Sequence, residues 1–137
     1  MTRKDGPVVG DVMTPEPITV PADAPLSEAA RLLEEHGIGG LPVVDRDGAL
    51  VGVLAESDLV RARATEHLWS RWPGLAVRHL MHAPALTADP LMPLAEAAAL
   101  MERAHVHRLI VVAPDASAPI GVISTRDIVR AIAGGRA

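Results

Sequence analysis

Ser124 and Asp127 lie three residues apart where an apolar strand gives way to a helix, and together they can bind a sugar phosphate. The apolar residues of 120–123 predict a short strand. Those of 128–132 recur at helical spacing and predict a helix near Thr125–Ala133. A helix N-terminus presents unpaired backbone N–H groups and a positive dipole end, which favour an anion. Ser124 adds a hydroxyl there, and Asp127 adds a carboxylate that can accept two hydrogen bonds from a sugar diol. The stretch therefore predicts a nucleotide site.

The same spacing also fits a capping box, in which the two side chains satisfy backbone donors and bind no ligand. On these four residues alone, the cap is the favoured interpretation. Repetition of the whole stretch elsewhere in the chain shifts the balance toward binding.

The chain contains two copies of one pattern, matched in four blocks that keep the same order. The strongest matches are V-G-V-L-A-E-S-D-L-V-R-A with I-G-V-I-S-T-R-D-I-V-R-A, and P-L-S-E-A-A-R-L-L-E with P-L-A-E-A-A-A-L-M-E. We assign residues 8–64 to the first repeat, 65–78 to a connection and 79–133 to the second repeat. A copy of this size buries little core alone, so the two are expected to form one unit.

Each repeat predicts the order strand–helix–strand–strand–helix, a mixed α/β fold. Pro25 and Pro93 suit the first position of the first helix of each repeat. Gly37 is a stop signal for the first of these helices, and D-R-D-G at 45–48 is a hairpin turn signal. Because the strands are apolar on both faces, we expect a pseudo-two-fold arrangement with sheets inside, helices outside and clefts where the halves meet.

Composition excludes several classes of function. The 137 residues carry a formal net charge of −4 and contain no cysteine, no phenylalanine and no tyrosine. No basic field is present for nucleic acid, no thiolate for catalysis or zinc binding, and no set of aromatic side chains for stacking bases. No apolar run reaches the roughly 18 residues of a membrane span. We expect a soluble, cytoplasmic protein without a membrane or nucleic-acid partner.

Six histidines raise the question of a metal site. His79 and His82 are three residues apart, and His105 and His107 are expected on one side of a strand. No His-Glu-x-x-His pattern accompanies them, so no metal site is expected. The serines have no His–acid arrangement and G-x-S-x-G is absent, so we expect no enzyme.

The connection carries Trp69 and Trp72, which either contact a partner or cover the end of the core. Four arginines in the connection or just before it are interpreted as solvated or as dimer contacts; they are Arg61, Arg63, Arg71 and Arg78.

These residues resemble a tandem pair of CBS domains, a family named from cystathionine β-synthase, whose pairs are also called Bateman modules. The resemblance covers residues 8–133 and rests on D-V-M-T-P followed by I-T-V-P-A-D-A-P-L-S-E-A-A and H-G-I-G-G-L-P-V-V-D-R-D-G-A-L-V-G-V-L. It implies two clefts for adenosine-containing ligands, a homodimer, and regulation of another, unidentified protein without catalysis or a required cofactor.

The binding pattern of this family, G-h-h-S/T-x-x-D with h apolar, is intact at residues 121–127. The resemblance implies Asp127 for the ribose hydroxyls and Ser124 for phosphate, with Thr125 beside them. The segment V-H-R-L at 106–109 is similar to one in the γ subunit of AMP-activated protein kinase. That likeness implies Arg108, with His107, as an anion clamp. The base would be surrounded by Met13, Thr14, Ile18, Ile38 and Gly39.

The first repeat departs from the pattern, because Ala55 replaces the hydroxyl and Gly40 stands where the second repeat has Arg108. Asp58 is kept. We therefore predict one good site for AMP, ADP or ATP. A second, weaker cleft with Asp58, Leu86 and Val106 suits adenosine or S-adenosylmethionine better than AMP, or stays empty. The alternatives are a ligand-free dimerisation or scaffold module with vestigial clefts, or a module that binds S-adenosylmethionine or NAD.

Overall fold

The computed structural model describes residues 6–137, and its internal contacts divide the chain into two units. Unit 1 joins the described part of the N-terminal segment up to Pro17 with Leu86–Ala137, and unit 2 is Ile18–Ala85. Residues 6–17, at the start of the first repeat, therefore pack with the second repeat. The residues just before Leu86, at the start of the second repeat, pack with the first repeat in the same way. We call these two stretches the leading segments.

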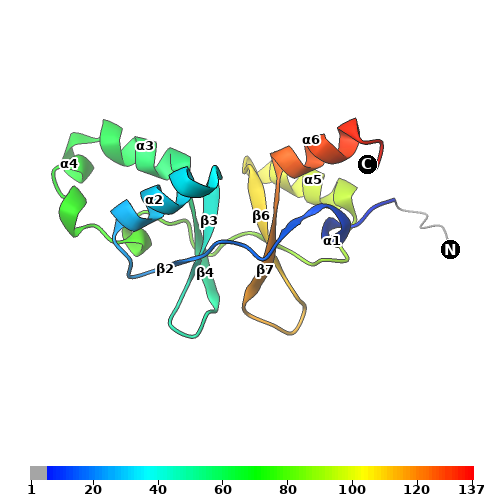
Figure 1. Cartoon of the computed structure of the whole chain (residues 1–137), viewed down its shortest axis with the longest axis horizontal. Helices are drawn as coiled ribbons and strands as arrows, with labels where there is room; N and C mark the ends of the chain where they lie inside the picture. Colours follow the sequence, from blue (N-terminus) through cyan, green and yellow to red (C-terminus); the bar gives the residue numbers. More distant parts are fainter. Residues whose placement is uncertain (1–5) are drawn as a thin grey trace. The chain divides into compact units, whose positions relative to one another are not determined.

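Unit 2 contains a three-stranded sheet and the helices that follow its strands (Figure 1). Its elements are β2 (Val20–Pro21), α2 (Leu26–His36), β3 (Gly40–Val44), β4 (Leu50–Ala55), α3 (Glu56–Ala64), α4 (Glu66–Trp69) and the 3₁₀ turns η1 (Trp72–Gly74) and η2 (Val77–His79). The sheet order is β2-β3-β4, with β2 parallel and β4 antiparallel to β3.

Unit 1 contains a four-stranded sheet with the order β1-β7-β6-β5. Its elements are α1 (Val9–Val12), β1 (Thr14–Pro15), β5 (Thr87–Ala88), α5 (Leu94–Ala104), β6 (Arg108–Val112), β7 (Pro119–Ser124) and α6 (Thr125–Ala133). Strand β5 is parallel to β6, whereas β7 is antiparallel to both β6 and β1. The predicted mixed α/β fold is confirmed in each unit.

The two leading segments dock through the same backbone hydrogen bonds. In unit 1, Val9 N donates to Met92 O at 2.8 Å; in unit 2, Val77 N donates to Ala24 O at 2.8 Å. Val9 and Val77 are both fully buried. Each leading segment is therefore part of the core of the unit it joins.

Local signals explain most helix ends, with one correction. Gly37 ends α2 in the left-handed conformation, with φ 59°, as predicted, and His105 takes the same conformation after α5. Pro25 and Pro93 are the N-caps of α2 and α5, with extended ψ of 149° and 139°, and not the first helical residues. The expected start was therefore wrong by one residue, because the residue that gives the chain its entry direction precedes the helix.

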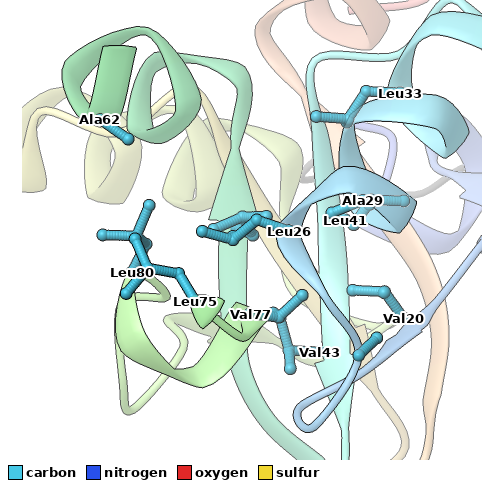
Figure 2. Close-up of a cluster of buried hydrophobic side chains, with 12 residues drawn as sticks. Val20, Leu26, Ala29, Leu33, Leu41, Val43, Ala62, Leu75, Val77 and Leu80 are labelled. Carbon is cyan, nitrogen blue, oxygen red and sulfur yellow. The ribbon is translucent and has the colours of Figure 1, made fainter. Parts of the chain in front are cut away.

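The core of unit 2 forms where the apolar stripe of α2 meets β3 and the 3₁₀ turns (Figure 2). Leu26, Leu41, Val43 and Val77 are fully buried in it. Trp72 packs against this cluster, which supports the interpretation that it covers the end of the core. Trp69 lies 4.9 Å from Trp72 between ring centroids and is partly exposed.

Helix α6 buries a different face from the one its apolar residues predict. Asp127 and Ala131 are its buried residues, whereas Val129 and Ile132 are 60% and 63% exposed. The equivalent helix α3 likewise buries Asp58 and Ala62 and exposes Val60. Both helices thus direct a carboxylate inward and an apolar side chain outward.

Candidate functional site

Asp127 lies at the first turn of α6, where β7 ends, and only 3% of it is exposed. Its Oδ2 accepts hydrogen bonds from Ser124 N at 2.9 Å and Ser124 Oγ at 3.1 Å. Its Oδ1 accepts from Thr14 Oγ1 at 3.1 Å and Arg130 Nη1 at 3.0 Å. A carboxylate has about four acceptor positions, so a ligand diol must displace one of these donors to reach it.

The Ser124–Asp127 pair is also a capping box. Asp127 N donates to Ser124 Oγ at 3.3 Å while Ser124 N donates to the carboxylate, so the capping interpretation is confirmed. Thr125 N donates to His107 O at 2.9 Å. The expectation of unpaired N–H groups at the start of α6 was therefore wrong for Asp127 N and Thr125 N. The Ser124 hydroxyl accepts from the first, and the backbone just before β6 accepts from the second.

Arg108 is brought next to Ser124 by the sheet. The two residues are direct partners in the antiparallel register of β6 and β7. A guanidinium and a hydroxyl on adjacent strands, one turn from a buried carboxylate, can together contact a phosphate and a sugar. This is the grouping that the sequence predicts for Arg108, Ser124 and Asp127.

A cavity of about 610 Å³ opens between α5, α6 and the segment before β6. Its walls include His107, Thr125 and Val106 of the predicted site residues; the other lining residues are Ala98, Met101, Glu102, His105, Ile128 and Val129. The cavity thus lies beside the start of α6 and is mostly apolar.

Met13 and Thr14 can pack beside β7, near Asp127, because Gly121 has no side chain. A Cβ at Gly121 would lie 2.5 Å from Met13 Sδ and 3.0 Å from Thr14 O. Thr14 pairs with Val122 across β1 and β7, which sets its hydroxyl against Asp127. Met13 and Thr14 thus pack in unit 1, the unit of Asp127, and their predicted contact with the base of a ligand stays a prediction.

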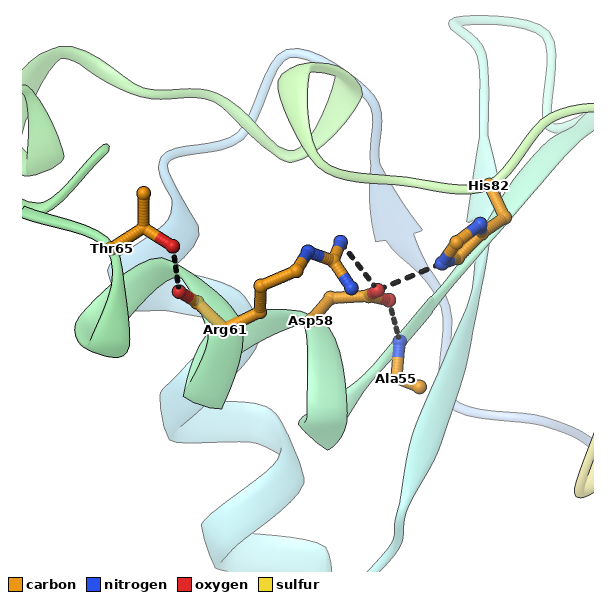
Figure 3. Close-up of polar contacts among 5 residues, drawn as sticks. All are labelled: Ala55, Asp58, Arg61, Thr65 and His82. Atoms are coloured by element: carbon orange, nitrogen blue, oxygen red, sulfur yellow. Dashed lines mark hydrogen bonds and ion pairs between the residues drawn. The ribbon is translucent and has the colours of Figure 1, made fainter. Parts of the chain in front are cut away.

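Asp58 is the counterpart of Asp127 in unit 2, and 1% of it is exposed. Its Oδ2 accepts from Ala55 N at 2.8 Å, and its Oδ1 lies 3.0 Å from Arg61 Nη2 and 2.8 Å from His82 Nε2 (Figure 3). The side chain of Arg61 is 51% exposed, as the solvated interpretation expects, but its guanidinium also binds this buried carboxylate. Sequence reasoning missed His82, although its alignment with Thr14 was the available signal.

The sheet of unit 2 places Gly40 opposite Ala55, the register that holds Arg108 opposite Ser124 in unit 1. The two donors absent from the first repeat are therefore missing from equivalent positions of one strand pair. Asp58 keeps its carboxylate without a hydroxyl or guanidinium on the adjacent strands.

The remaining predicted residues lie in their own units. Ile18 and Ile38 pack against the core of unit 2, and Gly39 O accepts from Glu56 N at 2.9 Å. Leu86 is partly exposed in unit 1. The predicted groupings that join residues of both units, for the good site and for the weaker cleft, stay predictions.

The histidines do not converge. His105 is the left-handed residue after α5 and His107 precedes β6, so their placement on one side of a strand was wrong. His79 Nδ1 accepts from Ala76 N at 2.8 Å. Among residues 6–137, no group of three or more His, Cys, Asp or Glu side chains is arranged to hold a metal ion. Within the same residues, no helix has the length and apolar character needed to cross a bilayer.

The CBS domain family model matches the chain twice, at residues 9–65 and 77–134. A curated relative, the chloroplastic CBS domain-containing protein CBSX2 of Arabidopsis thaliana, is 53% identical over 62 residues, or 45% of this chain. That match covers 26% of the relative, as does the match to its chloroplastic paralogue CBSX1, so the chain spans about a quarter of their length.

Two solved structures share the fold over nearly the whole chain. CBSX2 in complex with AMP has a TM-score of 0.82 at 31% identity, covering 96% of this chain and 100% of that one. The CBS domain pair of protein MJ0100, with methylthioadenosine and S-adenosyl-L-methionine, has a TM-score of 0.85 at 28% identity, covering 95% and 98%. The doubled pattern, the repeated site geometry and the two family matches lead to one conclusion: the chain is a tandem CBS-domain pair and belongs to the CBS domain family.

Proposed function

We propose that this CBS pair is a regulatory module that binds an adenosine-containing ligand, with AMP, ADP or ATP as the preferred class, at the site around Asp127. The observation that carries the proposal is the buried Asp127 carboxylate beside the Arg108–Ser124 strand pair. A carboxylate for a diol and a guanidinium with a hydroxyl for a phosphate match the two polar ends of a nucleotide. The AMP bound by CBSX2 supports this assignment.

Regulation requires that the ligand favour one of two states of the module, since equal affinity for both shifts nothing. Thr14 and Arg130 both bind Asp127 Oδ1 in this structure. A ligand diol that takes this oxygen releases Thr14 and with it the tether between β1 and α6. We propose this exchange as the link between binding and a change in the leading segment, which a partner protein then detects.

The test is a thermal-shift panel of AMP, ADP, ATP, NAD and S-adenosylmethionine on the chain and on Asp127→Asn. A ligand at about 100 times its dissociation constant stabilises the native state by roughly 2.7 kcal/mol, which is several degrees for a chain of this size. We expect the shift in the parent chain and its loss in Asp127→Asn. The matched control is Asp115→Asn, an exposed carboxylate in the β6–β7 loop. A shift that survives in Asp127→Asn, or no shift with any ligand, contradicts the proposal and favours the scaffold alternative.

We also propose that the chain forms a homodimer through the outer face of α6. Val129 and Ile132 are exposed on one side of this helix and next to the apolar cavity wall at Ile128. Val129→Lys together with Ile132→Lys should convert the dimer to monomer in sedimentation velocity. Leu91→Lys, an exposed apolar residue before α5, is the control and should leave the dimer intact. A monomeric parent chain contradicts the proposal.

A non-enzymatic role and a cytoplasmic location stay predictions of the sequence. The curated relatives named above are chloroplastic proteins.

A further inference from the structure

His82 occupies in unit 2 the place that Thr14 occupies in unit 1. Both residues follow a methionine, both pair through the backbone with the last strand of their unit, and both contact the Oδ1 atom of the buried aspartate. The contact is 3.1 Å for Thr14 and 2.8 Å for His82. The equivalence is therefore one of position and of partner atom.

The backbone holds His82 firmly at this position. Its N–H donates to Val53 O at 2.9 Å, and its carbonyl accepts from Val53 N at 3.0 Å. A Cβ at Gly52 would lie 2.8 Å from His82 O, so the two chains are in close contact. The imidazole can therefore leave Asp58 only by rotating its own side chain.

The environment of the imidazole places it between Asp58 and solvent. Asp58 is 1% exposed, whereas the side chain of His82 is 64% exposed. Figure 3 shows the ring and the Arg61 guanidinium converging on the same carboxylate oxygen, while Ala55 N takes the other. A ligand that approaches the carboxylate from solvent meets this ring.

The chemistry of the two residues differs. A threonine hydroxyl donates or accepts and turns about one bond, so it can yield Oδ1 and then bond to an incoming diol. An imidazole is larger, and the nitrogen that donates to the carboxylate cannot also accept from a diol. The hydrogen bond that a displaced imidazole gives up is therefore not regained from the ligand, and the loss of a hydrogen bond to a charged group lowers affinity about 10- to 100-fold.

We propose that His82 blocks the Asp58 carboxylate and thereby restricts the chain to one adenosine-type ligand, bound at Asp127. This inference rests on the proposed function, because it assumes that a buried aspartate of this kind accepts a ribose diol. On this inference, His82 determines how many adenosine-type ligands one chain binds. The phosphate donors that Ala55 and Gly40 lack then matter less for a ligand without phosphate.

The experiment measures adenosine binding by titration calorimetry, since adenosine carries the diol and needs no phosphate donor. The variants are Asp127→Ala, His82→Thr and the double variant. We expect one site in the parent chain, none in Asp127→Ala, two in His82→Thr and one in the double variant. Threonine is the natural occupant of the equivalent position, so it suits the backbone there. His36→Thr, which removes an exposed imidazole at the end of α2, is the control and should leave one site.

The outcomes separate the two ideas. One site in the parent chain and none in the double variant overturns the inference and leaves the proposed function standing. No site in the parent chain and one in the double variant contradicts the assignment to Asp127 and supports the block by His82. No adenosine site in either chain overturns the inference, and the thermal shift with AMP, ADP and ATP then decides the proposed function separately.

The reverse substitution decides the matter if His82→Thr does not fold, as judged by circular dichroism. Thr14→His leaves unit 2 unchanged and places an imidazole against Asp127. We expect adenosine affinity at Asp127 to fall at least 10-fold. Unchanged affinity in a folded Thr14→His chain overturns the inference.

Discussion

The sites around Asp127 and Asp58 share their supporting backbone and differ in their ligand-facing side chains. In both units the first N–H of the helix donates to the carbonyl of the residue immediately before the adjacent strand. Thr125 donates to His107 and Glu56 to Gly39, each at 2.9 Å. In both, an arginine one turn later binds Oδ1, at 3.0 Å. The duplicated pattern thus preserves the scaffold that buries an aspartate.

The differences lie at three positions that surround this aspartate. Ser124 is replaced by Ala55, Arg108 by Gly40 and Thr14 by His82. The first two changes remove donors suited to phosphate, and the third adds a ring over the carboxylate. The comparison teaches that burying the carboxylate is a property of the fold, whereas access and anion affinity depend on a few side chains.

The largest effect is expected when unit 1 is given the glycine of unit 2. Arg108→Gly removes a guanidinium from the phosphate end of the proposed site, and a charge-assisted hydrogen bond is worth about 1.5–3 kcal/mol. AMP affinity should fall roughly 10- to 100-fold while adenosine affinity changes little. Calorimetry with both ligands gives the ratio directly.

The control for this variant is Arg103→Gly or, to spare the helix, Arg103→Ala, since Arg103 is an exposed arginine on α5. An equal loss of AMP and adenosine affinity in Arg108→Gly would show that Arg108 supports the fold and does not bind phosphate.

The repeat made the symmetric part of this comparison predictable. Helix α6 was expected near Thr125–Ala133, the bounds the structure shows, because a strand signal, a cap and an apolar period agree there. The equivalence of Arg108 and Gly40 was likewise visible in the alignment and is confirmed by the strand register. The buried side of α6 was not predictable, since Val129 and Ile132 have the period of a core face yet lie exposed.

Contacts between segments that are distant in the sequence could not be predicted from the periodicity of apolar residues. Thr14 and Asp127 are 113 residues apart, and nothing in local spacing says that the leading segment of one repeat packs with the other. The contact of His82 with Asp58 was unpredictable for the same reason. It depends on an antiparallel backbone bridge between the segment before β5 and strand β4. A polar side chain without a motif becomes informative only once its partner is known.

A second comparison of the two units uses a glycine in each that another segment approaches closely. Replacing each glycine by alanine adds a Cβ at that contact. Gly52→Ala brings a Cβ within 2.8 Å of His82 O, a backbone atom, as well as Met81 Sδ. Gly121→Ala meets Met13 Sδ at 2.5 Å, near the end of a flexible side chain, whereas its nearest backbone atom, Thr14 O, lies at the looser distance of 3.0 Å. Overpacking costs about 1–3 kcal/mol, and we expect the Gly52 variant at the upper end and the Gly121 variant at the lower end in urea unfolding.

Methionine truncation sharpens this prediction through double-mutant cycles. Met13→Ala should recover most of the cost of Gly121→Ala, because the side chain that makes the shortest contact is removed and only the 3.0 Å contact with Thr14 O remains. Met81→Ala should recover less of the cost of Gly52→Ala, because His82 O remains in place. Equal recovery in the two units would contradict the distinction between backbone and side-chain contact.

The smallest expected effect comes from exchanging the caps. Ser124→Ala removes the hydroxyl that accepts from Asp127 N and donates to its carboxylate, so the free energy of unfolding should fall by about 1 kcal/mol. Ala55→Ser supplies the same hydroxyl beside Asp58, whose Oδ2 accepts from Ala55 N, and should raise the free energy of unfolding by a similar or smaller amount. Both are measured by urea denaturation, with Ser117→Ala in the exposed β6–β7 loop as the control. If Ser124→Ala weakens AMP binding without changing stability, the hydroxyl serves the ligand more than the helix. If it changes stability alone, the capping box accounts for this serine, and Arg108 is the main phosphate donor in unit 1.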